Sequence, residues 1–130
     1  HASHRTNPTT RRLFGGLEVI DWASLSSSLF ELDLTSNELT NVMTPLAVLT
    51  ELRELKVASN ALTGGIHPEW AHCTHMGTFD CSNNSLSGSI PTLHLTRMPR
   101  LVLLYLHGNK VARGRRPGAR PPAAFYSTEF

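Results

Sequence analysis

The sequence predicts an α/β solenoid, a right-handed superhelix with a short parallel β-sheet on its concave face and a mostly irregular or 3-10 convex side. Three observations lead to this class. Four segments share one spacing of apolar residues, an asparagine recurs in each of them at a nearly constant interval, and a Leu-x-Gly-x-apolar motif recurs between them. An internal repeat indicates the fold class more strongly than any single residue, because each unit must bury its apolar face against its neighbours.

The four segments each read apolar-x-x-apolar-x-apolar-x-x-Asn-x-apolar. They are LFELDLTSNEL (29–39), LRELKVASNAL (52–62), MGTFDCSNNSL (76–86) and LVLLYLHGNKV (101–111). Their asparagines lie 23, 24 and 25 residues apart, at Asn37, Asn60, Asn84 and Asn109. A period of about 20–29 residues with this spacing is the pattern of the leucine-rich repeat.

The first half of each segment alternates, which predicts a short strand whose side chains point in turn to either face. Strands of successive units should pair in parallel, since every unit runs in the same direction. The residues expected to point into the core are Leu32, Leu34, Leu55, Val57, Phe79, Cys81, Leu104 and Leu106. The repeated asparagines should be structural, because a buried amide can bond the backbone where each strand turns into a loop.

The second half of each unit also repeats. LTGGI (62–66) aligns with LSGSI (86–90), LFGGL (13–17) is another copy, and LTNVM (39–43) is a weaker one. The chain therefore holds about four units and part of a preceding one. Leu62 and Ile66 should face the core from the return side, and the glycines between them allow a positive φ. LSGSI runs into Pro91, and this Leu-x-Gly-x-Ile-Pro form resembles the plant-specific class of leucine-rich repeat.

Two tryptophans occur in the linkers between units. PEWAHCTHM (68–76) and DWASLSSSL (21–29) place Trp-Ala six or seven residues before the next unit. We expect Trp22 and Trp70 to pack over the return loops, because a recurring apolar position usually serves stacking. This Trp-Ala placement resembles the repeats of kinetoplastid (Leishmania-type) surface antigens and proteophosphoglycans. The resemblance implies a membrane-anchored parent glycoprotein at the cell surface.

Charge divides the chain into three parts. Residues 1–12 carry three arginines and no acid, and residues 112–130 carry four arginines against one glutamate. Residues 13–111 hold nine acidic and five basic residues, a net charge of −4. We expect a flexible basic N-terminal segment (1–12), a repeat domain (13–111) and a disordered basic tail rich in Pro, Gly and Arg (112–130). The tail lacks aromatic interleaving before Phe125, which argues against a nucleic-acid partner.

The residues between the inward ones should point out from the sheet and form columns across the units. The columns are Glu31, Glu54, Thr78 and Leu103; Asp33, Lys56, Asp80 and Tyr105; and Thr35, Ala58, Ser82 and His107. The concave face is the usual ligand surface of leucine-rich-repeat proteins, and this mixture of residue types suits protein recognition. The expected contacts are Lys56, Asp80, Leu103, Tyr105 and His107, and Tyr105 is the strongest candidate because aromatic residues dominate interface energies.

We expect no cofactor, no metal and no catalytic residue. The sequence has neither a Gly-rich phosphate loop nor a nucleophile elbow. Four residues of zinc-ligand type do not follow a zinc spacing: His72, Cys73, His75 and Cys81.

No apolar run approaches the roughly 20 residues of a membrane span, and no signal peptide or anchor is recognisable. Asn83, in the sequon Asn-Asn-Ser, is a candidate glycosylation site in a secreted chain.

These inferences predict a non-enzymatic module that binds a protein or a glycan on its concave face, as a fragment of a cell-surface antigen. Two alternatives stay open. One is an ectodomain fragment of a plant-type leucine-rich-repeat receptor, and the other is a structural spacer of a surface coat without a specific ligand. The extracellular location follows from the resemblance alone.

Overall fold

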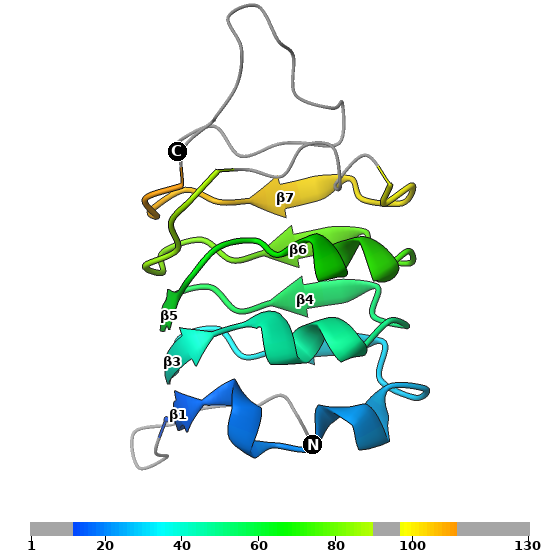
Figure 1. Cartoon of the computed structure of the whole chain (residues 1–130), viewed down its shortest axis with the longest axis horizontal. Helices are drawn as coiled ribbons and strands as arrows, with labels where there is room; N and C mark the ends of the chain where they lie inside the picture. The colour runs from blue at the N-terminus through cyan, green and yellow to red at the C-terminus, as the bar shows by residue number, and fades with distance from the viewer. Residues whose placement is uncertain (1–11, 90–96, 112–130) are drawn as a thin grey trace, which may run out of the picture.

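The computed structural model describes residues 12–89 and 97–111, which form a single stack of coils (Figure 1). The strands are β1 (Phe14–Gly16), β2 (Glu31–Asp33), β3 (Glu38–Val42), β4 (Glu54–Lys56), β5 (Ala61–Thr63), β6 (Thr78–Asp80) and β7 (Leu103–Tyr105). The 3-10 turns are η1 (Leu17–Val19), η2 (Trp22–Leu25), η3 (Thr44–Val48) and η4 (Pro68–His72). The basic N-terminal segment expected at 1–12, except its last residue, and the tail expected at 112–130 lie outside the described residues.

A four-stranded parallel sheet runs through the stack in the order β2-β4-β6-β7. Each of these strands comes from the first half of one repeat, so every coil adds one strand to the sheet. The central residues pair in register as Leu32, Leu55, Phe79 and Leu104. The predicted class, a leucine-rich-repeat α/β solenoid, is confirmed.

The core lies between the sheet and the return halves of the coils. All eight side chains expected to point inward from the strands are at most 2% exposed. Leu62 and Ile66 close the core from the other side, with 0% and 5% of their surfaces exposed. Burial of each such side chain stabilises the fold by about 1.5–3 kcal/mol, and no unit could obtain this burial alone.

The repeated asparagines join the coils. Asn84 donates from Nδ2 to the carbonyl oxygens of Cys81 (3.1 Å) and Ser82 (3.1 Å) in its own coil, and to that of Val57 (3.0 Å) in the preceding coil. Its Oδ1 accepts a hydrogen bond from the N–H of Leu62 at 3.1 Å. Asn109 and Asn60 make the same set of contacts one coil further on and one coil back. The ladder satisfies backbone groups that each turn would otherwise leave buried and unpaired.

The return side differs from the expected irregular or 3-10 structure. Besides the four 3-10 turns it carries a second parallel sheet in the order β1-β3-β5, which lies along one edge of the stack (Figure 1). Thr40 pairs with Gly16 on one side and with Ala61 on the other. The sheet forms because stacked coils bring equivalent Leu-x-Gly segments side by side, where their backbone groups can bond each other.

A left-handed residue ends each Leu-x-Gly segment. Gly15, Gly64 and Gly88 have φ values of 92°, 82° and 86°, and Asn41 takes the same place in the second unit with φ 66°. Asparagine tolerates this conformation better than most residues. The weaker sequence copy at 39–43 is therefore a conformational equivalent of the glycine motif.

Both tryptophans belong to the core. Trp22 in η2 is 4% exposed, and its Nε1 donates to the carbonyl oxygen of Leu17 at 2.8 Å. Trp70 in η4 is 0% exposed, and its ring lies 4.8 Å from that of Phe79 between centroids. The Nε1 of Trp70 has no hydrogen-bond partner among the described residues. Both side chains are thus buried, but only the Nε1 of Trp22 has a hydrogen-bond partner among the described residues.

Candidate ligand-binding face

The outward side chains of the four-stranded sheet form two straight rows. Pairing between the strands aligns Glu31, Glu54, Thr78 and Leu103 in the first row, and Asp33, Lys56, Asp80 and Tyr105 in the second. Neighbouring members of a row are about 4.8 Å apart, because that is the spacing of paired strands. The face is rigid, since each strand is anchored by a buried side chain between its two outward ones.

The two rows contain four of the five contacts that the sequence predicts. Lys56, Asp80, Leu103 and Tyr105 are all half-buried. His107, the fifth, follows β7 and is also half-buried. Its ring stands edge-on to that of Tyr105 at 88°, with 6.4 Å between centroids. The last repeat therefore presents an aromatic corner next to Asp80, the strand neighbour of Tyr105.

The charged residues of the face are held differently. The Oδ1 atom of Asp80 accepts hydrogen bonds from the hydroxyl (2.7 Å) and the N–H (3.1 Å) of Ser82. Asp33 accepts one from the N–H of Thr35 at 3.0 Å. Lys56 Nζ lies 4.0 Å from Glu54 Oε1, and both side chains are 40% exposed, so this ion pair contributes little to stability. Hydrogen bonds therefore orient the two aspartates, whereas Lys56 has only this long ion pair among the described residues.

The third expected column is not an outward row. Ala58 and Ser82 are only 6% and 3% exposed, because they lie where each coil turns and their carbonyl oxygens accept hydrogen bonds from the N–H groups of Ser36 and Ser59 in the coils before them. The alternation of the strand has already ended at this position. Of that column only Thr35 and His107, at its two ends, are half-buried.

Asn83, the candidate glycosylation residue, is exposed and has φ 55°. Its N–H donates to the carbonyl oxygen of His107 at 2.8 Å. Ser36 and Ser59 hold the same place in earlier coils, with φ values of 60° and 57°. Asn83 thus belongs to a second column of left-handed residues, immediately before the asparagine ladder.

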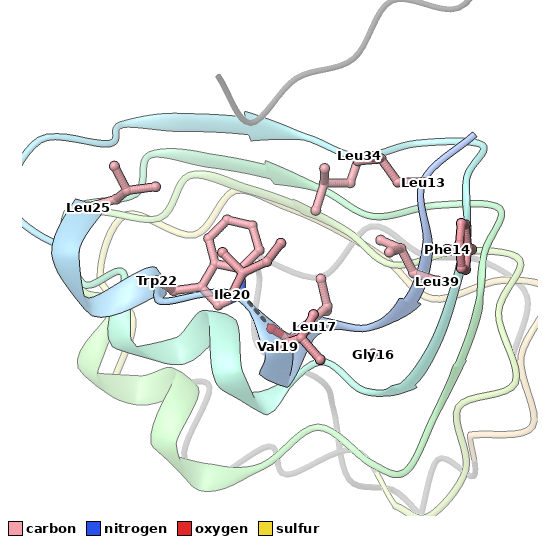
Figure 2. A pocket seen from close by; sticks show the side chains of 10 residues that line it. All are labelled: Leu13, Phe14, Gly16, Leu17, Val19, Ile20, Trp22, Leu25, Leu34 and Leu39. Atoms are coloured by element: carbon pink, nitrogen blue, oxygen red, sulfur yellow. Dashed lines mark hydrogen bonds between the residues drawn. The ribbon is translucent and has the colours of Figure 1, made fainter. Parts of the chain in front are cut away.

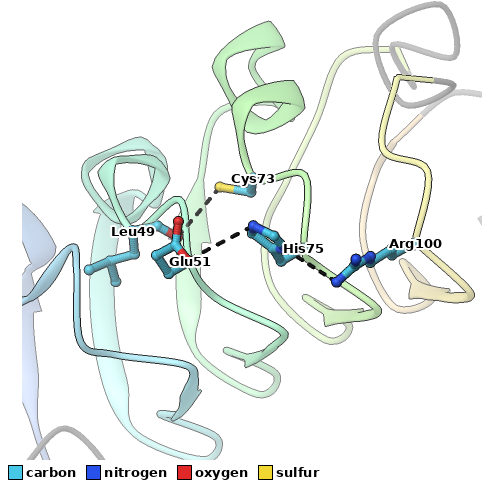
Figure 3. A network of polar contacts seen from close by, with 5 residues as sticks. All are labelled: Leu49, Glu51, Cys73, His75 and Arg100. Carbon is cyan, nitrogen blue, oxygen red and sulfur yellow. Dashed lines mark hydrogen bonds and ion pairs between the residues drawn. The ribbon is translucent and has the colours of Figure 1, made fainter.

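The His-Cys segment between η4 and β6 contributes His75 to a row of polar side chains. His75 Nε2 lies 3.9 Å from Glu51 Oε1, and its Nδ1 lies 3.3 Å from Arg100 Nη1, so that three coils contribute one residue each (Figure 3). Cys73 points into the core, where its Sγ lies 3.6 Å from the carbonyl oxygen of Ala47. Within the described ranges, no three His, Cys, Asp or Glu residues gather around a common point.

An apolar pocket at the N-terminal end of the stack was not anticipated from the sequence. Its volume is about 300 Å³. Leu17 of η1, Trp22 of η2 and Leu34, directly after β2, line it (Figure 2). Phe14 and Val19 at its rim are 79% and 77% exposed. The signal was present in LFGGLEVIDW (13–22), where six of the ten residues are large and apolar.

In the described part of the chain, no helix combines the length and apolarity that a bilayer crossing requires.

Comparisons with known proteins show that this architecture is similar to that of plant leucine-rich-repeat ectodomains. No family model matches the chain, and no curated protein matches it. Among solved structures, it is similar to the BIR2 ectodomain from Arabidopsis thaliana, with 32% identity over 76% of this chain and a TM-score of 0.69. It is also similar to a chain of the BIR3–SERK2 complex from Arabidopsis thaliana, with 32% identity over 86% of this chain and a TM-score of 0.70. The plant peptide hormone receptor RGFR1 in complex with RGF2 gives 26% identity over 77% and a TM-score of 0.71.

The chain spans about half the length of two of these structures, 51% for BIR2 and 56% for the BIR3–SERK2 chain, and 16% of RGFR1. The fold and these similarities define a leucine-rich-repeat protein with plant-type features. They favour the plant-type alternative and give no support to the resemblance to kinetoplastid surface antigens.

Proposed function

We propose that this chain is a non-enzymatic recognition module from the extracellular part of a plant-type leucine-rich-repeat receptor, with residues 13–111 as its repeat domain. Its binding surface is the outward face of β2, β4, β6 and β7, and its partner is a protein or peptide. The observation that carries the proposal is the pair of rows on this sheet, where charged and aromatic side chains stand in register on a rigid support.

The solved structures support the same class of partner. RGFR1 is in complex with RGF2, and the HAESA ectodomain is in complex with an IDA peptide hormone ligand. BIR3 is in complex with SERK2. The first two cases favour a peptide and the third a protein partner, whereas none of them supports the glycan that the sequence left open.

Within this face, the aromatic corner of β7 is the centre of the proposed contact. Tyr105 offers a large apolar ring with a polar tip, and such residues contribute most of the energy in many interfaces. Leu103 in the same strand adds apolar surface, and His107 adds a ring that can donate or accept a hydrogen bond. Asp80 and Lys56 then continue the contact across the neighbouring strands.

The test is selection from a display library of random linear peptides, using the full chain as the target. We expect enriched peptides that lose at least about fivefold in affinity for Tyr105→Ala or His107→Ala. Phe14→Ala is the matched control, because it removes an exposed aromatic ring from the other sheet. Failure to enrich any peptide, or enriched peptides whose affinity neither variant lowers, would favour the spacer alternative.

A further inference from the structure

The candidate binding face carries an uncompensated charge. Its two rows contain four carboxylates and one ammonium group, a net charge of −3, from Glu31, Asp33, Glu54, Asp80 and Lys56. Among the ion pairs between described residues, only the 4.0 Å contact of Lys56 with Glu54 involves this face. The face therefore presents a negative potential that a partner can neutralise.

The charge is distributed unevenly along the rows. Both outward residues of β2 are carboxylates, Glu31 and Asp33, and the first outward residue of β4 is Glu54. At the far end, β7 presents Leu103 and Tyr105, with no charged side chain. The face is thus acidic at its N-terminal strands and apolar and aromatic at its C-terminal strand.

Asp80 lies between these two ends, and one of its carboxylate oxygens is available to accept a hydrogen bond from a ligand. Ser82 fixes its Oδ1 with two hydrogen bonds, and Oδ2 accepts none from the described residues. The ring of Tyr105 stands on the adjacent strand in the same row. The open Oδ2 can therefore accept a hydrogen bond from an N–H of a ligand that crosses the sheet between its two ends.

We propose that the ligand of this face is an extended peptide with a basic side chain at one end and an aromatic or large apolar side chain at the other. This inference rests on the proposed function and specifies its partner. The peptide lies across the four strands, with its basic residue over β2 and β4 and its apolar residue on Leu103 and Tyr105.

The dimensions of the sheet set the spacing of the two side chains. From β2 to β7 there are three strand spacings, roughly 14 Å in all. An extended peptide rises about 3.3 Å per residue, so positions i and i+4 are about 13 Å apart. Because alternate side chains share a side of an extended chain, i and i+4 also point to the same face. The two recognised residues should therefore be four positions apart.

The experiment uses the full chain and defined peptides in a glycine–serine background. One peptide carries an arginine and, four residues later, a phenylalanine. The second replaces the arginine with glutamate, and the third places the two residues adjacent to each other. Affinities are measured by fluorescence anisotropy at about 0.1 M and about 1 M salt, where the screening length falls from about 10 Å to about 3 Å.

We expect the first peptide to bind at least about tenfold more tightly than the other two at the lower salt concentration, and to lose this advantage over the glutamate peptide at the higher one. The variant Glu31→Gln/Glu54→Gln, which removes one carboxylate from β2 and one from β4, should weaken binding of the first peptide about fivefold or more. The matched control Glu38→Gln/Glu69→Gln, which also removes two carboxylates but lies off the face, should leave it unchanged. Thermal unfolding of each variant shows that it is folded.

Two results would overturn the inference. One is equal binding of the arginine and glutamate peptides, or no binding of either. The other is a loss of affinity that is the same for both double variants. The proposed function has a separate readout: a library-selected ligand that is acidic or uncharged but still depends on Tyr105 would keep recognition on this face and reject the basic peptide. A library that yields no ligand dependent on Tyr105 would reject both.

Discussion

Asn60 reaches into the coil before it, where its Nδ2 donates to the carbonyl oxygen of Leu34 at 3.0 Å. The same side chain accepts a hydrogen bond at Oδ1 from the N–H of Leu39, also at 3.0 Å. One amide therefore connects two successive coils at the point where each strand ends. Because the ladder repeats at Asn84 and Asn109, it holds the sheet in register along the stack.

Replacing Asn60 with alanine should destabilise the whole solenoid. The change leaves the N–H of Leu39 without its partner in a part-buried region. The carbonyl oxygens of Leu34 and Val57 each lose one donor and keep another, from Asn37 and Asn84. We expect the free energy of unfolding to fall by about 1–3 kcal/mol, the cost of one unsatisfied buried group. Urea unfolding measures it, with Thr63→Ala, at an exposed position of β5, as a control of small effect. An unchanged free energy of unfolding for Asn60→Ala would show that the ladder is dispensable.

The left-handed position of the second unit can be tested at Asn41. The φ of Asn41 is 66°, a backbone conformation that raises the energy of any residue with a Cβ. The residues at the same place in three other units are glycines. Asn41→Ala should cost about 1 kcal/mol, since alanine cannot offset the strain by a local hydrogen bond. Asn41→Gly should remain within about 0.5 kcal/mol of wild type. Equal stability of the two variants would contradict the assigned backbone conformation.

The two tryptophans should respond differently to phenylalanine. Trp22→Phe removes the donor that bonds the carbonyl oxygen of Leu17 at 2.8 Å, whereas Trp70→Phe removes an Nε1 that has no partner among the described residues. Both changes lose similar packing volume. We therefore expect Trp22→Phe to cost about 1 kcal/mol more than Trp70→Phe in chemical denaturation. A larger loss for Trp70→Phe would mean that its Nε1 is satisfied in solution.

Burial of the thiols predicts a loss of stability at alkaline pH. Burial raises the pKa of Cys73 from 9.0 to about 11, and burial also raises the pKa of Cys81, assisted by the neighbouring charge of Asp80. The folded state keeps these thiols protonated while the unfolded chain ionises, so the unfolded state binds fewer protons above pH 9. The free energy of unfolding should be independent of these groups below that pH and decline from there toward pH 11.

The matched variant for this prediction is Cys73→Ala. It should show a shallower decline than wild type across the same range, even though its stability at neutral pH is lower through lost packing. Urea unfolding at several pH values gives both curves. Parallel curves for the two proteins would show that Cys73 is not shielded from ionisation.

Much of the fold could be predicted from the sequence, because the repeat fixes the spacing of the core residues along the chain. The intervals between Asn37, Asn60, Asn84 and Asn109 set the length of each coil, and strand alternation set which side chains face the core. The second sheet was missed because its strands are mostly three residues long and depend on hydrogen bonds between coils, which no single unit reveals. The third column was also predicted wrongly as an outward row, because the alternation of each strand ends before it. Ala58 and Ser82 in that column are buried.

The candidate face was predictable to a similar extent. The register of Lys56, Asp80 and Tyr105 follows from aligning the repeats, and pairing between the strands reproduces it. The orientation of Asp80 by Ser82 could not be predicted, because it depends on a turn whose geometry the repeat pattern does not encode. The apolar pocket at the first coil was not predicted, because every inward position of a unit was expected to be filled and buried.

The most direct test of recognition on the four-stranded sheet is a map of amide chemical shifts in the ¹⁵N-labelled chain during titration with a library-selected peptide. We predict that the largest changes fall on Glu31–Asp33, Glu54–Lys56, Thr78–Asp80 and Leu103–Tyr105. Changes concentrated instead on Phe14–Gly16, Glu38–Val42 and Ala61–Thr63 would place the ligand on the other sheet and contradict the account.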